Sequence, residues 1–473
     1  MQRTDAVVVG AGPNGLAAAL TLAQAGHAVE VFEGAATVGG GTRTEELTLP
    51  GFRHDVCSAV HPSLLASPFF RTLDLRALGI VARQPAIAYA QPLGGSRAAA
   101  LYRDVEDTAS HLGGDAGAYR HLMDPLVQWL DRIVPYVLSP MRGVPRDPLA
   151  LARFALVGTQ SARSVTRHFT TDAARALIAG ASAHSMQPLS APLTAAFGLL
   201  LAALGHGVGW PVVEGGSAAI GTGLAAELRR LGATVHTGHS VATLAELPPA
   251  RAVLLDVSPR QFVALAGPEL SWRAARPWSR FRPGPGVCKV DWALDGPVPW
   301  SAEACRRTVT VHVGGTFEEV ARAEAAVASG RHAEQPFVLV AQPGVVDASR
   351  APEGQQTLWA YCHVPNGSGV DMSERMEAQI ERFAPGFRDR VLARSVRTAA
   401  HAASHNPNLL GGDINGGAAT LRQTIFRPVP RWNPYRTPVD GVYLCSASTP
   451  PGGGVHGMCG VWAARAALAD RFS

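Results

Sequence analysis

The sequence predicts an α/β protein with a parallel sheet assembled from separate stretches of chain and a mixed α+β region inserted between them. Two observations carry this prediction. The first forty or so residues read as strand, helix and strand, and "DAVVVG" is the continuous β-branched run typical of a strand buried on both faces. The same pattern returns over 218–260 and again after 440, whereas the regions in between are rich in short strands. A chain of 473 residues is long enough for both parts.

Each element follows from a local pattern. Short β-branched or alternating apolar runs predict strands, and apolar residues at helical spacing predict helices that end near glycines such as Gly26. The stretch 188–213 has no Asp, Glu, Lys or Arg, but its internal prolines and short helical core indicate a buried helix, one that could wall an apolar cavity, and not a membrane span. The predicted strands are 5–10, 28–33, 86–90, 98–102, 233–241, 252–259, 286–295, 308–314, 337–343, 356–364 and 441–448, and the other predicted helices are 14–27, 118–138, 218–231, 317–328, 373–383 and 455–469.

A G-x-G-x-x-G motif runs from Gly10 to Gly15, directly after the first strand and at the start of the first helix. Its glycines permit a tight turn, close approach of the backbone to a diphosphate, and close packing of helix on strand. The helix N-terminus directs free N–H groups and its positive dipole end at the phosphates. Glu33 closes the second strand, where a carboxylate can hold ribose hydroxyls. The sequence therefore predicts a dinucleotide site.

Two further glycine-rich segments favour FAD over NAD, and Glu33 disfavours NADP because it repels a 2′-phosphate. The first segment, "VGGGTRT" (Val38–Thr44), offers backbone N–H groups and two polar side chains to a cofactor that continues past its phosphates. The second, "SASTPPGGGVHGMCG" (Ser446–Gly460), can approach a flavin edge closely. A helix starting near Val455 would point its N-terminus at the ring and stabilise negative charge there by about 0.3–1 kcal/mol.

These motifs, with "EGAATVGGGTRTEELTLPGFRHDVCSAVHP", "VVEGGSAAIGTGLAAELRRLGATVHTGHSV" and "DGVYLCSASTPPGGGVHGMCGVWAA", resemble the phytoene desaturase-like FAD-dependent oxidoreductases. The most similar subgroup is that of pyridine nucleotide-disulphide oxidoreductase domain-containing protein 2. The resemblance implies a discontinuous Rossmann-like FAD-binding domain of the glutathione-reductase type with an inserted α+β substrate domain, as in the monoamine oxidase and phytoene desaturase fold. We expect residues 1–75, 205–260 and 425–473 to form the FAD-binding domain, and 76–204 and 261–424 the substrate domain.

The resemblance also implies which residues hold the cofactor. Many desaturases have G-G-R where this chain has Gly39-Gly40-Gly41, with Arg43 displaced by two positions, so the role of that arginine stays open. The implied contacts are Gly10, Gly12, Pro13, Asn14 and Gly15 to the pyrophosphate; Glu33 to the adenosine ribose; Gly40, Gly41, Thr42 and Arg43 along the phosphates and ribityl chain; the Val241 backbone to adenine; and Ser446, Gly454, Val455 and His456 around the ribityl and isoalloxazine.

Two residues are candidates for catalysis. His456 lies in the flavin-facing tract and could shuttle a proton or donate a hydrogen bond, or it could be structural. Lys289, the only lysine, lies on an alternating strand and is either an exposed strand residue or a lysine near the flavin, as the monoamine oxidase fold often places one. The loop 406–417, which contains Asp413, is either a cavity wall or a surface loop. The histidines show no metal-ligand spacing, so no metal is predicted.

The expected reaction is FAD-dependent removal of hydride from an apolar or mixed-polarity organic molecule, and desaturation is the leading candidate among such reactions. Flavin amine oxidation is the alternative with the same cofactor, and it calls for an aromatic pair. A protein that holds FAD and acts only by binding is the alternative of another class. The chain has no C-x-x-C and no second strand–G-x-G-x-x-G–helix unit in its interior, so electrons are expected to leave to oxygen or a quinone. The aromatic candidates are Trp432, Tyr435, Tyr443 and Trp462.

Composition narrows the partners and the compartment. The net charge of +5 comes from 42 basic and 37 acidic residues without a basic cluster, which argues against nucleic acid and limits membrane contact to the periphery. The six cysteines form no close pair, and the N-terminal apolar run is a strand and not a signal sequence. We therefore expect a cytoplasmic protein with free thiols.

Overall fold

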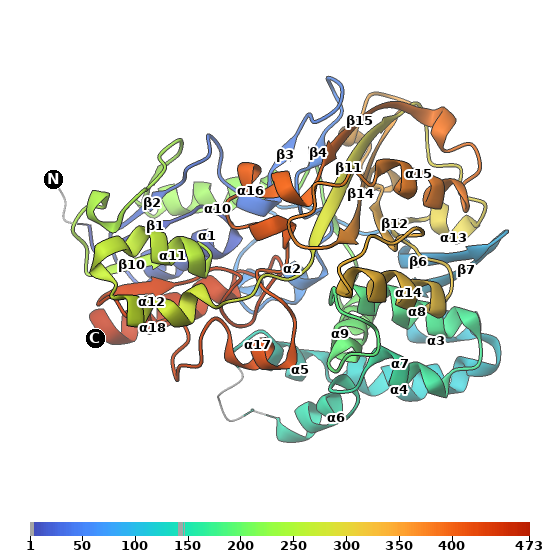
Figure 1. The fold of residues 1–473 in the computed structure, drawn as a ribbon, viewed down its shortest axis with the longest axis horizontal. Helices are drawn as coiled ribbons and strands as arrows, with labels where there is room; N and C mark the ends of the chain where they lie inside the picture. Colours follow the sequence, from blue (N-terminus) through green and yellow to red (C-terminus); the bar gives the residue numbers. More distant parts are fainter. Residues whose placement is uncertain (1–3, 141–144, 146) are drawn as a thin grey trace.

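The structure, a computed structural model, describes residues 4–140, 145 and 147–473. A five-stranded sheet occupies one side of the molecule in the order β16-β10-β1-β2-β9, and every neighbouring pair is parallel (Figure 1). This arrangement confirms the predicted Rossmann-like α/β fold. Its strands, which fall within the three stretches assigned above to the nucleotide domain, are β1 (Ala6–Val9), β2 (Val29–Phe32), β9 (Thr234–His236), β10 (Ala252–Leu255) and β16 (Val442–Leu444).

Helices cover both faces of this sheet, which explains why its strands are apolar on both sides. Ala6 and Val8 of β1 belong to the core beneath one set of helices, while Val7 and Val9 belong to the core beneath the other. Such double burial is typical of parallel sheets. The first set consists of α1 (Pro13–Gln24), α10 (Ala218–Arg230) and α18 (Met458–Arg471), and the second of α11 (Pro259–Ala266) and α12 (Trp272–Ser279).

The two ends of the chain pack against each other. Helix α18 lies against α1, and Gly460 makes the contact possible, because a Cβ atom at this position would lie 1.9 Å from the carbonyl oxygen of Asn14. Both termini are at the same end of the molecule (Figure 1). Helix α18 begins at Met458, so the prediction of a helix starting near Val455 was wrong by three residues. Gly457, at a φ of +69°, turns the chain into the helix.

A seven-stranded sheet forms the other side of the molecule in the order β15-β11-β14-β13-β12-β6-β7 (Figure 1). One face of it packs on a separate core with α13 (Glu303–Arg306) and α15 (Ser373–Glu381), and the opposite face looks toward the cavity described below. The strands are β6 (Ile87–Gly94), β7 (Arg97–Tyr102), β11 (Gly286–Leu294), β12 (Thr308–Val313), β13 (Val338–Ala341), β14 (Gln356–Val364) and β15 (Val391–Arg397).

A helical region completes this half. The helix predicted over 118–138 is two helices that meet at Trp129, each with an internal proline, Pro125 or Pro135, that removes a backbone donor. The stretch 188–213 contains the buried helix α9, and none of the helices in the described residues is long and apolar enough to cross a membrane. The helices are α3 (Val105–Ser110), α4 (Ala116–Gln128), α5 (Leu130–Val137), α6 (Pro148–Gly158), α7 (Ala162–Val165), α8 (Asp172–Ala183), α9 (Thr194–Gly207) and α14 (Phe317–Ala328).

Short elements join the two halves. They are the helices α2 (Pro62–Ala66), α16 (Ala402–His405) and α17 (Leu421–Phe426) and the strands β3 (Thr44–Glu45), β4 (His54–Asp55), β5 (Ala82–Arg83) and β8 (Val212–Val213).

Candidate functional site

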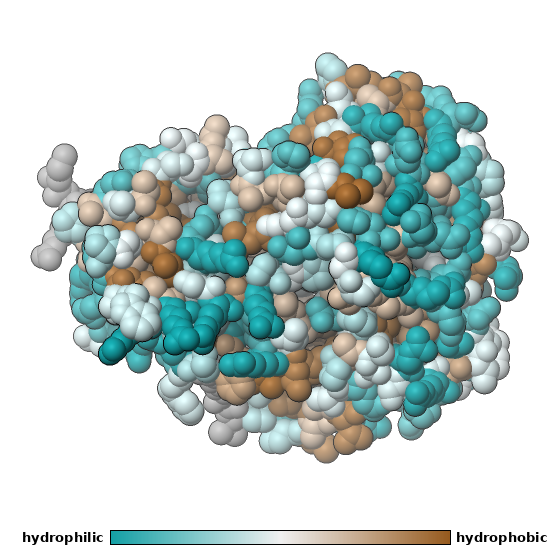
Figure 2. Space-filling model, viewed as in Figure 1, coloured by the Kyte–Doolittle hydropathy of each residue, from teal (hydrophilic) through white to brown (hydrophobic). Residues whose placement is uncertain are grey.

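A cavity of about 1130 Å³ extends from the glycine-rich loop after β1 to the seven-stranded sheet. Pockets for one drug-sized ligand measure about 300–1,000 Å³. The cavity therefore has room for a cofactor together with a substrate. Between the two halves the outline of the molecule is indented, at the top of the space-filling view (Figure 2).

The glycine-rich loop forms one end of the cavity, and its glycines are required by close contacts. A Cβ atom on Gly12 would lie 2.9 Å from Asp256 Oδ2, and one on Gly15 would lie 2.0 Å from the carbonyl oxygen of Gly10, whose φ is +98°. Gly10, Gly12, Pro13 and Asn14 line the cavity, whereas Gly15 lies behind them as a packing residue. The Asn14 Oδ1 atom is buried without a hydrogen-bond partner among the described residues. This end of the cavity fits the diphosphate of a dinucleotide.

Two carboxyl groups flank the loop. Glu33 lines the cavity at the end of β2, where it accepts hydrogen bonds from the N–H groups of Ala11 (2.6 Å) and Ala35 (2.9 Å). Asp256, which the sequence reasoning missed, follows β10 and accepts a hydrogen bond from the Gly15 N–H at 3.0 Å. Burial raises the pKa of Asp256 to about 7, and the neighbouring charge of Glu33 adds to this effect. Its position after a central parallel strand, where ligands of such sheets bind, was the signal that could have found it.

The second glycine-rich segment continues the wall. Gly40, Gly41, Thr42 and Arg43 all line the cavity. The Arg43 guanidinium donates to the carbonyl oxygens of Gly40 (3.2 Å) and His405 (3.1 Å) and lies 2.9 Å from the His405 ring nitrogen Nε2. Burial and the nearby cations lower the pKa of His405 to about 4. Arg43 is therefore held by backbone carbonyls and by a neutral imidazole, with the Glu45 carboxylate 3.9 Å away, and its charge lies at the cavity wall.

The C-terminal tract lies on the same cavity. Ser446, Gly454, Val455 and His456 line it, as does Val241. His456 is buried, its Nδ1 accepts a hydrogen bond from the Met458 N–H at 3.0 Å, and burial lowers its pKa to about 4. The imidazole is thus neutral near pH 7 with its proton on Nε2. Because the N–H of Met458 is already paired with His456, the first amide of α18 is not free for a ligand.

Lys289 is neither exposed, as the simpler expectation had it, nor on the cavity wall. It is 5 % exposed on β11, forms an ion pair with Asp291, and its ammonium lies 5.6 Å from the ring centre of Trp359. His54 Nδ1 is 3.5 Å from Asp291 on the other side. Burial lowers the pKa of Lys289, whereas the charge of Asp291 opposes this change. The lysine therefore lies one layer behind the cavity, beside Trp359, which is part of the wall.

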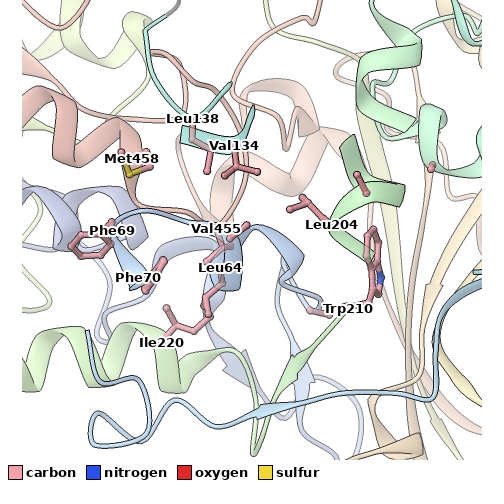
Figure 3. Packing of buried hydrophobic residues seen from close by; sticks show 14 of the residues in the cluster. Leu64, Phe69, Phe70, Val134, Leu138, Leu204, Trp210, Ile220, Val455 and Met458 are labelled. Atoms are coloured by element: carbon pink, nitrogen blue, oxygen red, sulfur yellow. The ribbon is translucent and has the colours of Figure 1, made fainter. Parts of the chain in front are cut away.

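The far end of the cavity is apolar. Figure 3 shows Val134 of α5, Leu138 directly after that helix, Leu204 of α9 and Val455 around a common space, with Trp210 beside it. The buried helix α9 is thus part of the wall. Other apolar and aromatic side chains on the wall include Val137, Phe197, Leu200, Leu201, Leu339, Trp359 and Tyr361.

Few polar groups enter this compartment. Residues 406–409 and 413–416 are cavity wall, but the Asp413 carboxylate is buried and accepts the N–H groups of Gly284, Asn415 and Gly417 at 2.7–2.8 Å. His184 lines the cavity and its Nε2 lies 3.1 Å from that of His312. Burial keeps the pKa of both imidazoles low, at about 3 for His184, so the pair is uncharged. The four aromatic candidates, Trp432, Tyr435, Tyr443 and Trp462, are absent from the wall formed by the described residues.

Comparisons with known proteins agree with this fold. Residues 8–73 match the NAD(P)-binding Rossmann-like domain family. A putrescine oxidase solved with putrescine bound has a TM-score of 0.60 at 18% identity, over 99% of this chain and 98% of that one. A phytoene desaturase (neurosporene-forming) of Rhodobacter capsulatus is 30% identical over 162 residues, 32% of this chain and 30% of that protein. The chain therefore has a Rossmann-like dinucleotide-binding domain, is similar over about a third of its length to a phytoene desaturase, and shares its overall fold with an amine oxidase.

The resemblance predicted from the motifs is confirmed over the full chain. The pyridine nucleotide-disulfide oxidoreductase domain-containing protein 2 of Rattus norvegicus is 25% identical over 558 aligned residues, which cover 98% of this chain and 93% of that protein.

Proposed function

We propose that this chain is an FAD-dependent dehydrogenase or oxidase that removes hydride from an apolar or mixed-polarity organic molecule, with desaturation of a C–C bond as the leading reaction. One observation carries the proposal. A single cavity connects the glycine-rich loop to a compartment lined mainly by aliphatic and aromatic side chains. A molecule bound in that compartment lies beside the C-terminal tract, where a flavin ring would meet it.

The described residues fit FAD. The glycine-rich loop has no room for Cβ atoms at Gly12 or Gly15, the Asn14 Oδ1 is unpartnered, and Glu33 is presented at the position expected of a ribose ligand. FAD would supply the two-electron acceptor when bound. The chain would supply binding and orientation, and it would exclude water from the apolar compartment. We propose oxygen or a quinone as the final acceptor.

Neutral groups in the compartment favour a neutral substrate. The acidic residues on the described wall are Glu33, Asp256 and Asp413. The first two flank the glycine-rich loop, and the oxygens of Asp413 already accept three backbone N–H groups. A substrate ammonium would therefore find no free carboxylate, and hydrophobic contact remains the main source of affinity.

Amine oxidation is the second candidate, and none of the four aromatic residues named for it from the sequence lines the described cavity wall, whereas Trp359 and Tyr361 do. Trp432 is 85 % exposed, the Tyr443 hydroxyl donates to Asp470, and the Trp462 indole donates to the Leu138 carbonyl. A flavin-holding protein without turnover is the third candidate, and a reduction experiment separates it from the first two.

The experiment begins with the absorption spectrum of the purified protein, which should be yellow. Under anaerobic conditions, neutral apolar compounds with an oxidisable C–C bond should bleach the flavin, and primary amines should not. The substitution Leu201→Asp places a charge in the compartment and should abolish bleaching while flavin is retained. Its matched control, Leu156→Asp, changes a residue of α6 that is 74 % exposed and off the cavity wall, and should bleach normally.

The proposal fails in distinct ways. Bleaching by amines alone would replace desaturation with amine oxidation. Bound flavin that no compound in a broad screen reduces would favour the binding protein. A colourless protein that does not bind added FAD would refute the proposal that FAD is the cofactor.

A further inference from the structure

Asp256 follows β10 and packs against the glycine-rich loop, at a place where no sequence motif calls for an acidic residue. Its carboxyl accepts one hydrogen bond, from the Gly15 N–H at 3.0 Å, and Oδ2 would lie 2.9 Å from a Cβ on Gly12. The side chain is 8 % exposed and lines the cavity. Its backbone is also fixed, because Asn408 donates to the Asp256 carbonyl at 2.8 Å and accepts the Ser258 N–H at 2.7 Å. A diphosphate bound to this loop would therefore meet the Asp256 carboxyl.

The titratable groups around this carboxyl are either negative or uncharged, so they disfavour a second anion beside it. The titratable groups that interact with it are Glu33 at the end of β2, Cys445 after β16 and Cys459 on α18. Burial raises the pKa of both thiols, to about 11 for Cys459, so neither is charged near pH 7. No ion pair in the described part of the chain includes Asp256. Only the Gly15 N–H and the N-terminal end of α1 favour its ionised form.

We propose that Asp256 takes up a proton when the dinucleotide binds and, as the neutral acid, donates a hydrogen bond to a diphosphate oxygen. This inference rests on the proposed FAD cofactor. The proton comes from solvent and is bound at Asp256, so no other group changes its charge. A diphosphate brings two negative charges to a buried site that holds no cation partner for Asp256, and like charges at short range favour protonation of the carboxyl. The neutral acid, in contrast, offers a donor where phosphate oxygens need one.

Because the pKa of Asp256 lies near neutral pH, the proton uptake that accompanies FAD binding can be measured there. Burial already brings the pKa of Asp256 to about 7 before any phosphate arrives. Below this pH the carboxyl is already mostly protonated, so FAD binding takes up few additional protons. Above it, each FAD bound requires a proton, so the affinity falls by up to about tenfold for each pH unit.

The test is titration of FAD into flavin-free protein from pH 5.5 to 9, followed by flavin fluorescence. We expect an almost constant Kd below about pH 6 and a rise that approaches tenfold per pH unit above pH 7 to 8. Calorimetry at pH 8 in two buffers of different ionisation enthalpy should show close to one proton taken up per FAD. This proton count uses the unchanged protein, so it does not depend on whether a variant folds.

Two variants sharpen the result. Asp256→Asn keeps the shape and removes the proton exchange, so its Kd should be independent of pH and its proton uptake should vanish. Glu33→Gln removes the negative charge that raises the pKa of Asp256. It should weaken binding at every pH while keeping the proton uptake, with the onset of the pH dependence moved to lower pH.

The outcomes separate this inference from the proposed function. Tight FAD binding by the unchanged protein without proton uptake at pH 8 would overturn the role of Asp256 and leave the cofactor in place. The same pH dependence in Asp256→Asn would overturn it as well. If FAD does not bind at any pH, both the inference and the proposed cofactor are wrong.

Discussion

The substitution Gly460→Ala is the most direct test of the packing of α18, at the C-terminal end of the chain, against α1, near the N-terminal end. A Cβ on Gly460 would lie 1.9 Å from the Asn14 carbonyl oxygen and 2.8 Å from the Ala18 nitrogen, both of them backbone atoms that cannot rotate away. Real contacts of a Cβ stay beyond 3.0 Å, so α18 must move from α1 by about 1 Å. Overpacking of this kind costs about 1–3 kcal/mol, and backbone neighbours favour the upper end.

The assay is urea unfolding followed by circular dichroism, together with the flavin content of the purified protein. Gly460→Ala should unfold at lower urea and retain less flavin, because α18 directly follows the tract that lines the cavity. Gly117→Ala is the matched control: this glycine is also helical, in α4, and a Cβ there meets open space. The control should be neutral or more stable by up to about 1 kcal/mol. Equal stability and flavin content in Gly460→Ala and the unchanged protein would refute the close packing of the two helices.

Two further predictions concern the catalytic candidates. Lys289→Met leaves Asp291 buried without its partner and should lower the free energy of unfolding by about 3–5 kcal/mol. The double variant Lys289→Met with Asp291→Asn should recover most of this loss. Equal unfolding of the single and double variants in urea would contradict a structural ion pair. His456→Ala should slow anaerobic flavin reduction by at least about tenfold if the imidazole takes part in the reaction. The rate that depends on His456 should be constant between pH 5.5 and 8.5, because its pKa of about 4 keeps it neutral there, and a step in the unchanged enzyme near pH 6.5 that is lost in His456→Ala would show a normally titrating histidine.

Much of the fold was predictable because its signals are local. The run "DAVVVG" is apolar on both faces of a strand, and the structure has β1 there, with α1 starting one residue earlier than expected. The predicted helix 317–328 matches α14, which begins at a Thr316–Glu319 capping box. Errors arose where local patterns are ambiguous: the internal prolines of 118–138 accompany two helices, and the glycines before Met458 delay the start of α18.

The cavity residues beyond the motifs could not be predicted, because what places them is contact over long distances in the chain. Asp256 contacts Gly15, which is 241 positions away in the sequence. An acidic residue after a strand does not by itself show that burial will raise its pKa. Lys289 has the alternating neighbours of an exposed strand residue, but both faces of the seven-stranded sheet are covered, and the lysine is buried with Asp291 as its partner. Trp359 and Tyr361 look like ordinary strand residues until β14 takes its place beside the cavity.

By itself, the sequence determined the dinucleotide-binding loop, because the glycines and the elements around them interact over a few residues of chain and must be of these types. It also determined the identity of most strands and helices through their apolar periodicity. Only the tertiary structure decided which surfaces enclose the cavity, which charges lose contact with water, and which carboxyl lies against the glycine-rich loop. Those properties depend on distance in space, which the separation of residues along the chain does not set.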